Sequence, residues 1–418
     1  MADPIRVLHF ADLHVGMENY GRLDPVSGLN GRVMDFLERL DTVIAYAEAH
    51  EADLVLFAGD AFRNRNPSPT YQREFAQRIR ALSLLGIETV LLVGNHDVPV
   101  MTQRASSIEI FGTLAVPHVT VIDKPRLLEI ATPRGSVQIA AIPYPVRQRL
   151  LTQDQYRSLS QEELDGAVSG VVVQMIDGMA ARLRPDIPAI LLGHFSVAEA
   201  RWGSERNIMV GRDVTLPVSA LVDPRWSYVA LGHVHQHQNL NPDGVPPVVY
   251  SGSLERVDFG EERQSKGFCW VELGMNGAGE PEAAWRYVEV AARRFLTLRV
   301  DVRKEPDPVA ALEAATAGHD LAGAVVRLVI RMTPDQEPGL RDGDVAPFLA
   351  DAAYSQINRE IDRAVRDRLE GVDPDAMVPL KLLERYLLGK GRSAEELAPY
   401  LEAAQAILGV DETLPEEG

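Results

Sequence analysis

The stretch IRVLHFADLHVG (residues 5–16) joins an apolar run of strand length to an Asp-Leu-His motif. Its first six residues are typical of a short buried β-strand, and Asp12 and His14 follow that strand directly. A lone Asp-x-His is a weak signal, because it commonly marks a turn. Its meaning therefore depends on whether similar residues follow the other strands of the chain.

Residues that suit a metal ion follow four more apolar runs. They are Asp60 in FAGDAF, Asn95, His96 and Asp97 in LVGNHDVP, His194 in LLGHFS, and His233, His235 and His237 in LGHVHQH. Ligands of open α/β sheets bind beyond the carboxyl ends of the strands. Five separate segments therefore bring carboxylate, carboxamide or imidazole groups to one edge. Such a set, each member after an apolar strand, is hard to obtain from unrelated turns.

The stretch LGHVHQH places three histidines within five residues. On an extended chain, residues i, i+2 and i+4 share one face, so the spacing allows all three rings to reach one point. A histidine-rich loop in solvent has the same spacing. The tract alone therefore does not establish a metal site, and the convergence of the other segments decides in its favour.

Helical patterns alternate with the apolar strands in the first half of the chain. One helix is indicated by apolar residues at helical spacing from Val33 to Ala47, and another is expected from about Thr70 to Leu85. Later strands are expected at VQIAAI, IPAILL, YVALG, PVVYSG and GFCWVEL. Helices that alternate with buried strands predict an α/β fold.

The pattern changes from about residue 284. The stretches FLTLRVDV, DPVAALEAATA and GAVVRLVIRM predict a smaller α+β unit, which we place at residues 284–370. Residues 354–366 fit either a helix or an extended edge. A linker is expected at 371–374, followed by two short helices within 375–410, the second of which opens with Ser393 and Glu396 in capping-box spacing.

Composition limits the classes of function. The net charge is −18, which argues against a basic surface coat for nucleic acid but leaves room for a local site built from cations and a few arginines. No apolar run is long enough to span a bilayer, and the N-terminus lacks the pattern of a signal peptide. The single cysteine, Cys269, lies in an apolar run and is expected to be a small buried residue. These features favour the cytoplasm.

The donor types narrow the choice of metal. Carboxylate, carboxamide and imidazole without thiolate suit manganese, iron or zinc rather than a structural zinc knot. A donor set of this size is too large for one first-row ion and fits two. Two ions ~3.5–4 Å apart could share a carboxylate and a water, and such a pair suits the hydrolysis of a phosphoester.

The five motifs DLH, GD, GNHD, GH and GHVH resemble those of calcineurin-like metallophosphoesterases. Within that superfamily the chain is similar to the SbcD-type DNA repair nucleases of the meiotic recombination eleven family. The stretches that carry this similarity are GLNGRVMDFLERLD, GDAFRNRNPSP, IPYPVR and YSGSLERVDFGEERQSKGF. The resemblance covers nearly the whole chain. It implies a sandwich of two sheets flanked by helices at residues 1–283, a DNA-facing cap at 284–370 and an ATPase-binding helical tail at 375–410.

The resemblance also implies a role for each site residue. Asp12, His14, Asp60 and His235 would bind one ion, and Asp60, Asn95, His194 and His233 the other, so that Asp60 bridges the two. His96 would act on the scissile phosphate without binding metal. Asp97 would either orient His96 or close a turn, and Arg63 would either contact a phosphate or remain a plain surface residue. His237 falls outside the motif and is expected to be solvated or to lie behind the ligands.

The function implied is that of a nuclease with two manganese ions, with iron or zinc as alternatives. It would be an exonuclease on duplex ends and an endonuclease on single-stranded DNA, partnered by an SMC-like ATPase of the SbcC type in double-strand-break repair, and a homodimer. Two other hypotheses stay open at this point. One is a small-molecule phosphodiesterase or phosphatase of the same superfamily, and the other is a non-catalytic scaffold that binds DNA ends and tethers the ATPase.

Overall fold

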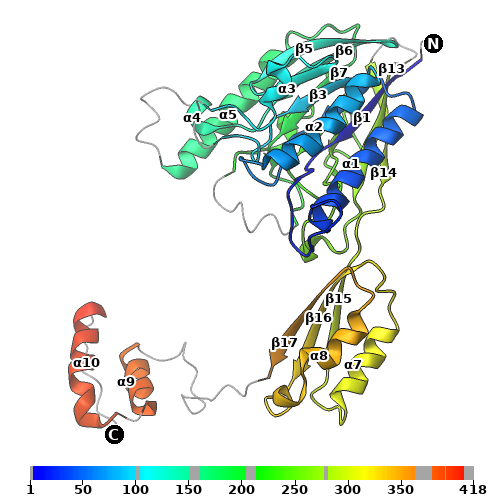
Figure 1. Cartoon of the computed structure of the whole chain (residues 1–418). Helices are drawn as coiled ribbons and strands as arrows, with labels where there is room; N and C mark the ends of the chain where they lie inside the picture. Colours follow the sequence, from blue (N-terminus) through cyan, green and yellow to red (C-terminus); the bar gives the residue numbers. More distant parts are fainter. Residues whose placement is uncertain are drawn as a thin grey trace. The chain divides into compact units, whose positions relative to one another are not determined.

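Two six-stranded β-sheets face each other in a computed structural model of the chain (Figure 1). The structure describes residues 3–99, 104–150, 160–203, 213–276, 281–362, 379–390 and 392–408. The first sheet has the strand order β14-β13-β1-β2-β3-β4 and the second has the order β11-β12-β10-β7-β6-β5. Apolar side chains of both sheets, among them Val7, Leu56, Ile190 and Ala230, fill the space between them.

The first sheet contains the strands that carry the first three motifs. Its strands are β1 (Ile5–Phe10), β2 (Leu54–Phe57), β3 (Glu88–Leu92), β4 (Val119–Ile122), β13 (Gly267–Met275) and β14 (Pro281–Glu289). Strands β1 to β4 run parallel, while β13 pairs antiparallel with both β1 and β14. The apolar runs expected as β1, β2, β3 and β13 are confirmed as strands. Cys269 lies in β13 and is buried, as expected.

The second sheet carries the last two motifs. Its strands are β5 (Arg126–Thr132), β6 (Gly135–Ile142), β7 (Ala189–His194), β10 (Tyr228–Gly232), β11 (Gln238–Asn239) and β12 (Val248–Tyr250). Strands β6, β7, β10 and β12 are parallel to one another. Two short strands, β8 (Ser196–Val197) and β9 (Thr215–Leu216), pair beside this sheet.

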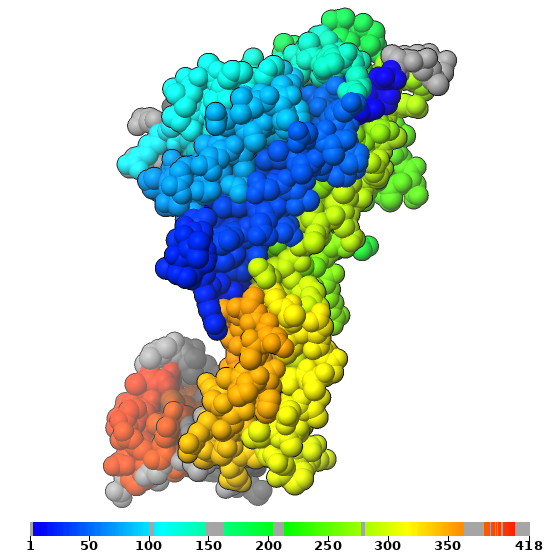
Figure 2. Space-filling model, turned by 45° about the vertical axis from the view of Figure 1, so that its right-hand side comes forward, coloured from blue at the N-terminus to red at the C-terminus, as the bar shows by residue number. Residues whose placement is uncertain are grey.

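Helices cover the outer face of each sheet. The first sheet is covered by α1 (Gly31–Ala49), α2 (Pro69–Leu84) and α3 (Glu109–Thr113), and the second by α5 (Gln161–Ala180), which follows the one-turn α4 (Arg147–Leu150). Asn30 caps α1 by accepting a hydrogen bond from the Arg32 amide. In Figure 2 the blue α1 and the yellow-green strand pair β13–β14 run along the same face. The predicted sandwich of two sheets flanked by helices is confirmed.

A three-stranded sheet of order β15-β16-β17 forms most of the predicted cap. The strands and helices of this part of the chain are, in order, β15 (Phe295–Asp301), α7 (Pro308–Ala317), β16 (Val325–Met332), η4 (Glu337–Gly339), α8 (Asp342–Val345), η5 (Ala346–Leu349) and β17 (Tyr354–Ile361). The ambiguous stretch is therefore a strand over its first eight residues. The boundary predicted between residues 283 and 284 falls inside β14, which pairs with β13 along its whole length and belongs to the first sheet.

The tail contains two helices, α9 (Pro379–Gly389) and α10 (Ala394–Leu408), which pack against each other. The Ser393 amide donates a hydrogen bond to Glu396 Oε2, as the capping-box spacing predicts. The predicted linker at 371–374 lies outside the described residues.

The chain divides into two compact units, one of Met1–Ile330 and Leu340–Arg359 and the other of Arg331–Gly339 and Glu360–Gly418. Among the helices that the structure describes, none combines the length and apolar character needed to cross a membrane.

Candidate metal centre

The carboxyl ends of parallel strands from both sheets meet at one place, as the sequence predicts. Strands β1, β2 and β3 deliver residues from the first sheet, and β7 and β10 deliver residues from the second. The seven predicted ligands there are all buried, with exposed fractions from 0% to 8%: Asp12, His14, Asp60, Asn95, His194, His233 and His235. Buried polar side chains need partners, so the way in which these residues meet one another is informative.

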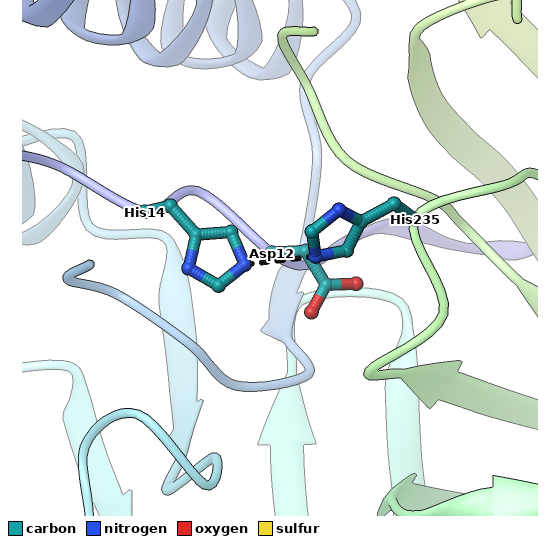
Figure 3. A group of neighbouring side chains, drawn as sticks. All are labelled: Asp12, His14 and His235. Atoms are coloured by element: carbon teal, nitrogen blue, oxygen red, sulfur yellow. Dashed lines mark hydrogen bonds between the residues drawn. The ribbon is translucent and has the colours of Figure 1, made fainter. Parts of the chain in front are cut away.

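Asp12, His14 and His235 form the first donor group. Each offers a ligand atom within 4.8 Å of the others. The Nε2 atoms of His14 and His235 lie 3.0 Å apart, as the dashed line in Figure 3 shows. Two ligand atoms that share one ion at ~2.1 Å each lie roughly 3 Å apart. The spacing of the two ring nitrogens therefore fits a divalent ion between them.

Asn95, His194 and His233 form the second donor group together with Asp60. Asn95 Oδ1 lies 2.9 Å from His194 Nε2 and 2.9 Å from His233 Nδ1. The opposite nitrogen of His194, Nδ1, donates a hydrogen bond to the Ala58 carbonyl over 2.6 Å. Because a carbonyl can only accept, the proton of a neutral His194 lies on Nδ1 and its Nε2 keeps a lone pair for an ion.

Asp60 lies between the two groups. Its Oδ2 is 3.4 Å from His194 Nε2 in the second group and 3.8 Å from His14 Nε2 in the first. Its Oδ1 accepts a hydrogen bond from the His96 amide over 2.8 Å, which fixes the orientation of the carboxylate. This position fits the bridging carboxylate that the sequence predicts.

His96 differs from the seven predicted ligands because it is only half-buried. Its Nδ1 donates a hydrogen bond to the Arg63 carbonyl over 2.6 Å, which leaves Nε2 as the atom free to meet a substrate. The ring also lies close to His14, at 4.8 Å between centroids, and near Asp60. A role on the phosphate rather than on metal stays a prediction, and the partial exposure of the ring supports it.

The backbone is strained at four of the predicted ligands. Asp12, His14, Asp60 and His233 have φ values of 53°, 49°, 64° and 97°, in the left-handed region that residues with a Cβ atom rarely adopt. Strain of this kind costs roughly 1–3 kcal/mol per residue and persists where the surrounding structure imposes it. Each strand therefore ends in an abrupt turn that directs a polar side chain toward the centre.

Glycines allow the loops of the site to approach one another closely. A Cβ atom on Gly94 would lie 2.4 Å from the Asp60 amide nitrogen, and one on Gly59 would lie 2.4 Å from His194 Nδ1. Gly59 also has a φ of 99°. These two contacts give a physical reason for glycine before Asp60 and before Asn95 in the second and third motifs.

The Asp97 side chain holds the backbone of the loops that follow β2 and β3 by hydrogen bonds. Its carboxylate accepts hydrogen bonds from the amides of Asp60, Ala61 and Gly94, at 3.0 to 3.2 Å, and from the Ser107 hydroxyl at 2.9 Å. Burial and the nearby Asp60 charge raise the pKa of Asp97 to about 6. Of the two roles considered for Asp97, these partners favour the structural one.

Arg63 has an exposed side chain. Its backbone is tied down on both sides, because its amide donates to the Val15 carbonyl over 3.0 Å and its own carbonyl accepts from His96. A contact between the Arg63 guanidinium and a DNA phosphate stays a prediction.

Binding of a divalent ion is expected to release a proton and to weaken as the pH falls. Burial alone would lower the pKa of His194, but the neighbouring Asp60 carboxylate raises it to about 9. A histidine ligand must be neutral, so His194 has to lose its proton when an ion binds at pH 7. The affinity of this site should therefore fall about tenfold per pH unit below that pKa. Calorimetric titration with manganese, in buffers of different ionisation enthalpy, measures the number of protons released when the ion binds. Binding of manganese at pH 7 without release of a proton would contradict the expectation.

His237 is half-buried and packs on an aromatic ring, so of the two alternatives given for it the structure does not favour a fully solvated side chain. Its ring stacks on Tyr287 with centroids 3.8 Å apart and an angle of 11° between the planes, and its Nδ1 donates to the Tyr250 carbonyl over 2.9 Å. Among the described residues, the groups that could hold an ion do not include it. The turn after β10 directs His233 and His235 into the two donor groups and His237 onto the Tyr287 ring.

We expect His237→Ala to leave metal content and catalytic rate unchanged. The substitution removes a stacked aromatic pair, so the free energy of unfolding should fall by about 1 kcal/mol. Metal analysis and thermal denaturation of the purified variant test both parts. Loss of one metal equivalent would show that the third histidine of LGHVHQH is a ligand after all.

Sequence reasoning missed two carboxylates that contact the ligands. Glu261 Oε1 lies 2.7 Å from His235 Nδ1, and Asp213 Oδ2 lies 2.6 Å from His233 Nε2. Glu261 belongs to SGSLERVDFGE, a stretch already singled out by resemblance, so a signal was present. Asp213 lies in the stretch MVGRDVTL, whose local pattern carries no comparable signal.

Comparison with known proteins gives consistent matches. The model of the family described as calcineurin-like phosphoesterase matches residues 5–237. The chain is 30% identical over 298 residues to the D subunit of the nuclease SbcCD of Bacillus subtilis (strain 168), covering 70% of this chain and 71% of that protein. It is 27% identical over 272 residues to the corresponding SbcCD protein of Escherichia coli (strain K12), covering 63% of each. It is 26% identical over 302 residues to the DNA double-strand break repair protein Mre11 of Methanosarcina mazei, covering 72% of this chain and 41% of that protein.

Proposed function

Because this chain belongs to the calcineurin-like phosphoesterase family, within it to the SbcD-type nucleases, and is thus a metal-dependent phosphodiester hydrolase, we propose that it cuts DNA with two manganese ions. It acts as an exonuclease on duplex ends and as an endonuclease on single strands. The observation that carries the proposal is the pair of buried donor groups that meet at Asp60. Their oxygen and nitrogen atoms, without thiolate, suit manganese, with iron and zinc as alternatives.

Each residue of the site has a part in this proposal. Asp12, His14 and His235 would hold one ion, Asn95, His194 and His233 would hold the other, and Asp60 would contribute to both. Two divalent ions held there would supply an activated water and charge neutralisation for the attack on a phosphodiester. In its imidazolium form His96 would donate from Nε2 to a phosphate oxygen or to the leaving oxygen, while its Nδ1 donates to the Arg63 carbonyl. The bound cations let a chain of net charge −18 accept a polyanion locally.

A comparison of substrates tests this function. Purified protein with manganese should cut single-stranded DNA far faster than a nitrophenyl phosphodiester at equal concentration, because binding energy from the rest of the DNA strand helps to position the scissile bond. The reverse preference would favour the small-molecule phosphodiesterase. Binding of DNA ends without any cleavage would favour the scaffold.

We also propose that the chain works in the cytoplasm as a homodimer with an SMC-like ATPase of the SbcC type. The helices α9 and α10 are the proposed docking segment. Leu380 and Leu397 are buried, while Tyr386, Leu388 and Tyr400 stay 44% to 47% exposed. Exposed apolar side chains on a helix pair suit recognition in a groove of a partner.

Truncation of the chain before Asp375 is expected to separate the two activities. The shortened protein should remain a folded, manganese-dependent nuclease on single strands, since all the donor residues precede the cut. It should lose association with the ATPase, and with it ATP-dependent cutting of duplex DNA. Co-purification of the truncated chain with the ATPase would refute the docking role, and loss of the nuclease fold would show that the tail packs on the rest of the chain instead.

A further inference from the structure

Two carboxylates outside the predicted ligand set contact the two histidines of the last motif. Glu261 is 0% exposed, and its Oε1 accepts a hydrogen bond from His235 Nδ1 over 2.7 Å. The side chain of Asp213 is 9% exposed, and its Oδ2 accepts one from His233 Nε2 over 2.6 Å. One carboxylate thus serves a histidine of the first donor group and the other serves a histidine of the second.

These contacts fix opposite tautomers in the two rings. A carboxylate accepts, so His235 carries its proton on Nδ1 and His233 carries its proton on Nε2. The nitrogens left with a lone pair are His235 Nε2 and His233 Nδ1. The first lies 3.0 Å from His14 Nε2 and the second lies 2.9 Å from Asn95 Oδ1. Each carboxylate therefore turns the lone pair of one ring toward the other donor atoms of its own group.

Glu261 is itself held by several partners. Lys266 Nζ lies 2.8 Å from Glu261 Oε2, and the Val257 amide donates to the same oxygen over 2.9 Å. Both side chains of the Glu261–Lys266 pair are fully buried. The residue ends η3 (Phe259–Glu261), and the next residue, Glu262, accepts hydrogen bonds from the amide and hydroxyl of Thr297 in β15. The carboxylate that meets His235 is thus fixed by the ion pair with Lys266 and by the hydrogen bond from the Val257 amide.

Asp213 is held from two other elements. The Ser196 hydroxyl of β8 donates to Asp213 Oδ2, and the Tyr144 hydroxyl after β6 is also hydrogen-bonded to Asp213. Asp213 therefore has a set of partners separate from those that hold Glu261. The two carboxylates can be altered independently.

We propose that Glu261 and Asp213 are positioning residues, each of which sets the affinity of one metal site. Glu261 acts on the site of Asp12, His14 and His235, and Asp213 acts on the site of Asn95, His194 and His233. The inference rests on the proposed function in that it assumes two divalent ions at these donors. Partners of this kind orient a histidine and increase its basicity, and their loss typically costs 10- to 100-fold in metal affinity.

Titration of the metal-free full-length chain with manganese alone tests the proposal, with no DNA present. Wild-type protein should bind two ions. Glu261→Gln should lower the affinity of one site about 10- to 100-fold and leave the other unchanged, and Asp213→Asn should do the same to the other site. Both substitutions keep the size of the side chain and remove its charge, so each is the matched control for the other.

Double substitutions assign each carboxylate to its site. In a His14→Ala background, where the first site is already damaged, Glu261→Gln should add little further loss of manganese affinity, whereas Asp213→Asn should add its full effect. In an Asn95→Ala background, where the second site is damaged, Asp213→Asn should add little further loss of manganese affinity, whereas Glu261→Gln should add its full effect. Glu261→Gln leaves the Lys266 ammonium buried without its carboxylate partner. The charge-balanced variant Glu261→Gln with Lys266→Met removes that ammonium, together with its hydrogen bonds to the His235 carbonyl and the Ser253 hydroxyl, and should repeat the affinity loss in a folded chain.

The proposal is overturned if both single variants keep wild-type affinity at both sites, or if each lowers both sites equally. It is also overturned if the charge-balanced variant folds and binds two ions as tightly as wild type. The proposed function fails separately, if the wild-type chain binds two manganese ions but cuts no DNA. Failure of the positioning role of Glu261 and Asp213 is therefore distinguishable from failure of the proposed nuclease function.

Discussion

Replacing His96 with alanine is expected to slow DNA cleavage about 100- to 1,000-fold while both manganese ions remain bound. The loss of rate follows from the removal of a group that contacts the phosphate or the leaving oxygen in the transition state. The ions stay because His96 is half-buried at the edge of the site, whereas the seven predicted ligands are at most 8% exposed. Manganese content and the rate of single-strand cleavage, measured on the same preparation, test both parts.

A second histidine serves as the control for this variant. His118 is partly exposed, pairs with Glu88 over 2.7 Å and lies outside the candidate metal centre, so His118→Ala should cut at the wild-type rate. The role of His96 would be ruled out by an alanine variant that binds manganese normally and cuts DNA as fast as wild type. Loss of an ion from His96→Ala would instead make His96 a ligand, since His14, Asp60 and His96 also lie within reach of one ion.

Replacing Asp60 with alanine should damage metal binding more than any single histidine substitution. One oxygen of Asp60 lies 3.4 Å from His194 and 3.8 Å from His14, so under the proposed assignment a single change would remove a ligand from both sites. It also leaves two cations facing each other with no carboxylate between them, and unscreened charges in a buried site repel strongly. We expect losses beyond the roughly 10- to 100-fold that removal of an outer partner costs, at both sites at once.

Calorimetric titration with manganese compares this variant with His194→Ala, which should lose affinity chiefly at the second site. Thermal denaturation of the metal-free proteins controls for folding, because the Asp60 carboxylate also accepts the His96 amide. Two sites of wild-type affinity in Asp60→Ala would rule out the bridge.

The sandwich could be predicted from the sequence because its central strands are parallel and buried on both faces. Such strands form continuous apolar runs, and IRVLHF, IPAILL and YVALG are of this kind. Strand β14 was missed because it is an edge strand whose residues alternate between exposed and half-buried. Strand β17 was ambiguous for a related reason, since its side chains are mostly half-buried and its pattern fits two periods.

The ligands could be predicted because each either ends its strand, as His194 does, or follows it within a few residues, so local pattern and topology together bring them to one edge. Glu261 and Asp213 could not be assigned in this way. Each lies 20 or more residues from the histidine that it contacts, and only the folded chain brings the two together. The packing of His237 on Tyr287 likewise depends on an edge strand that the sequence did not reveal.

The central claim, that two ions at the Asp60 centre make this chain a DNA nuclease, is tested most directly by one titration. Metal-free protein is mixed with increasing manganese while bound manganese and cleavage of single-stranded DNA are followed together. We predict two ions bound per chain, with cleavage that appears only as the second site fills and that a chelator abolishes. Cleavage that persists in excess chelator, or a chain that binds two ions and leaves the DNA intact, would contradict the claim.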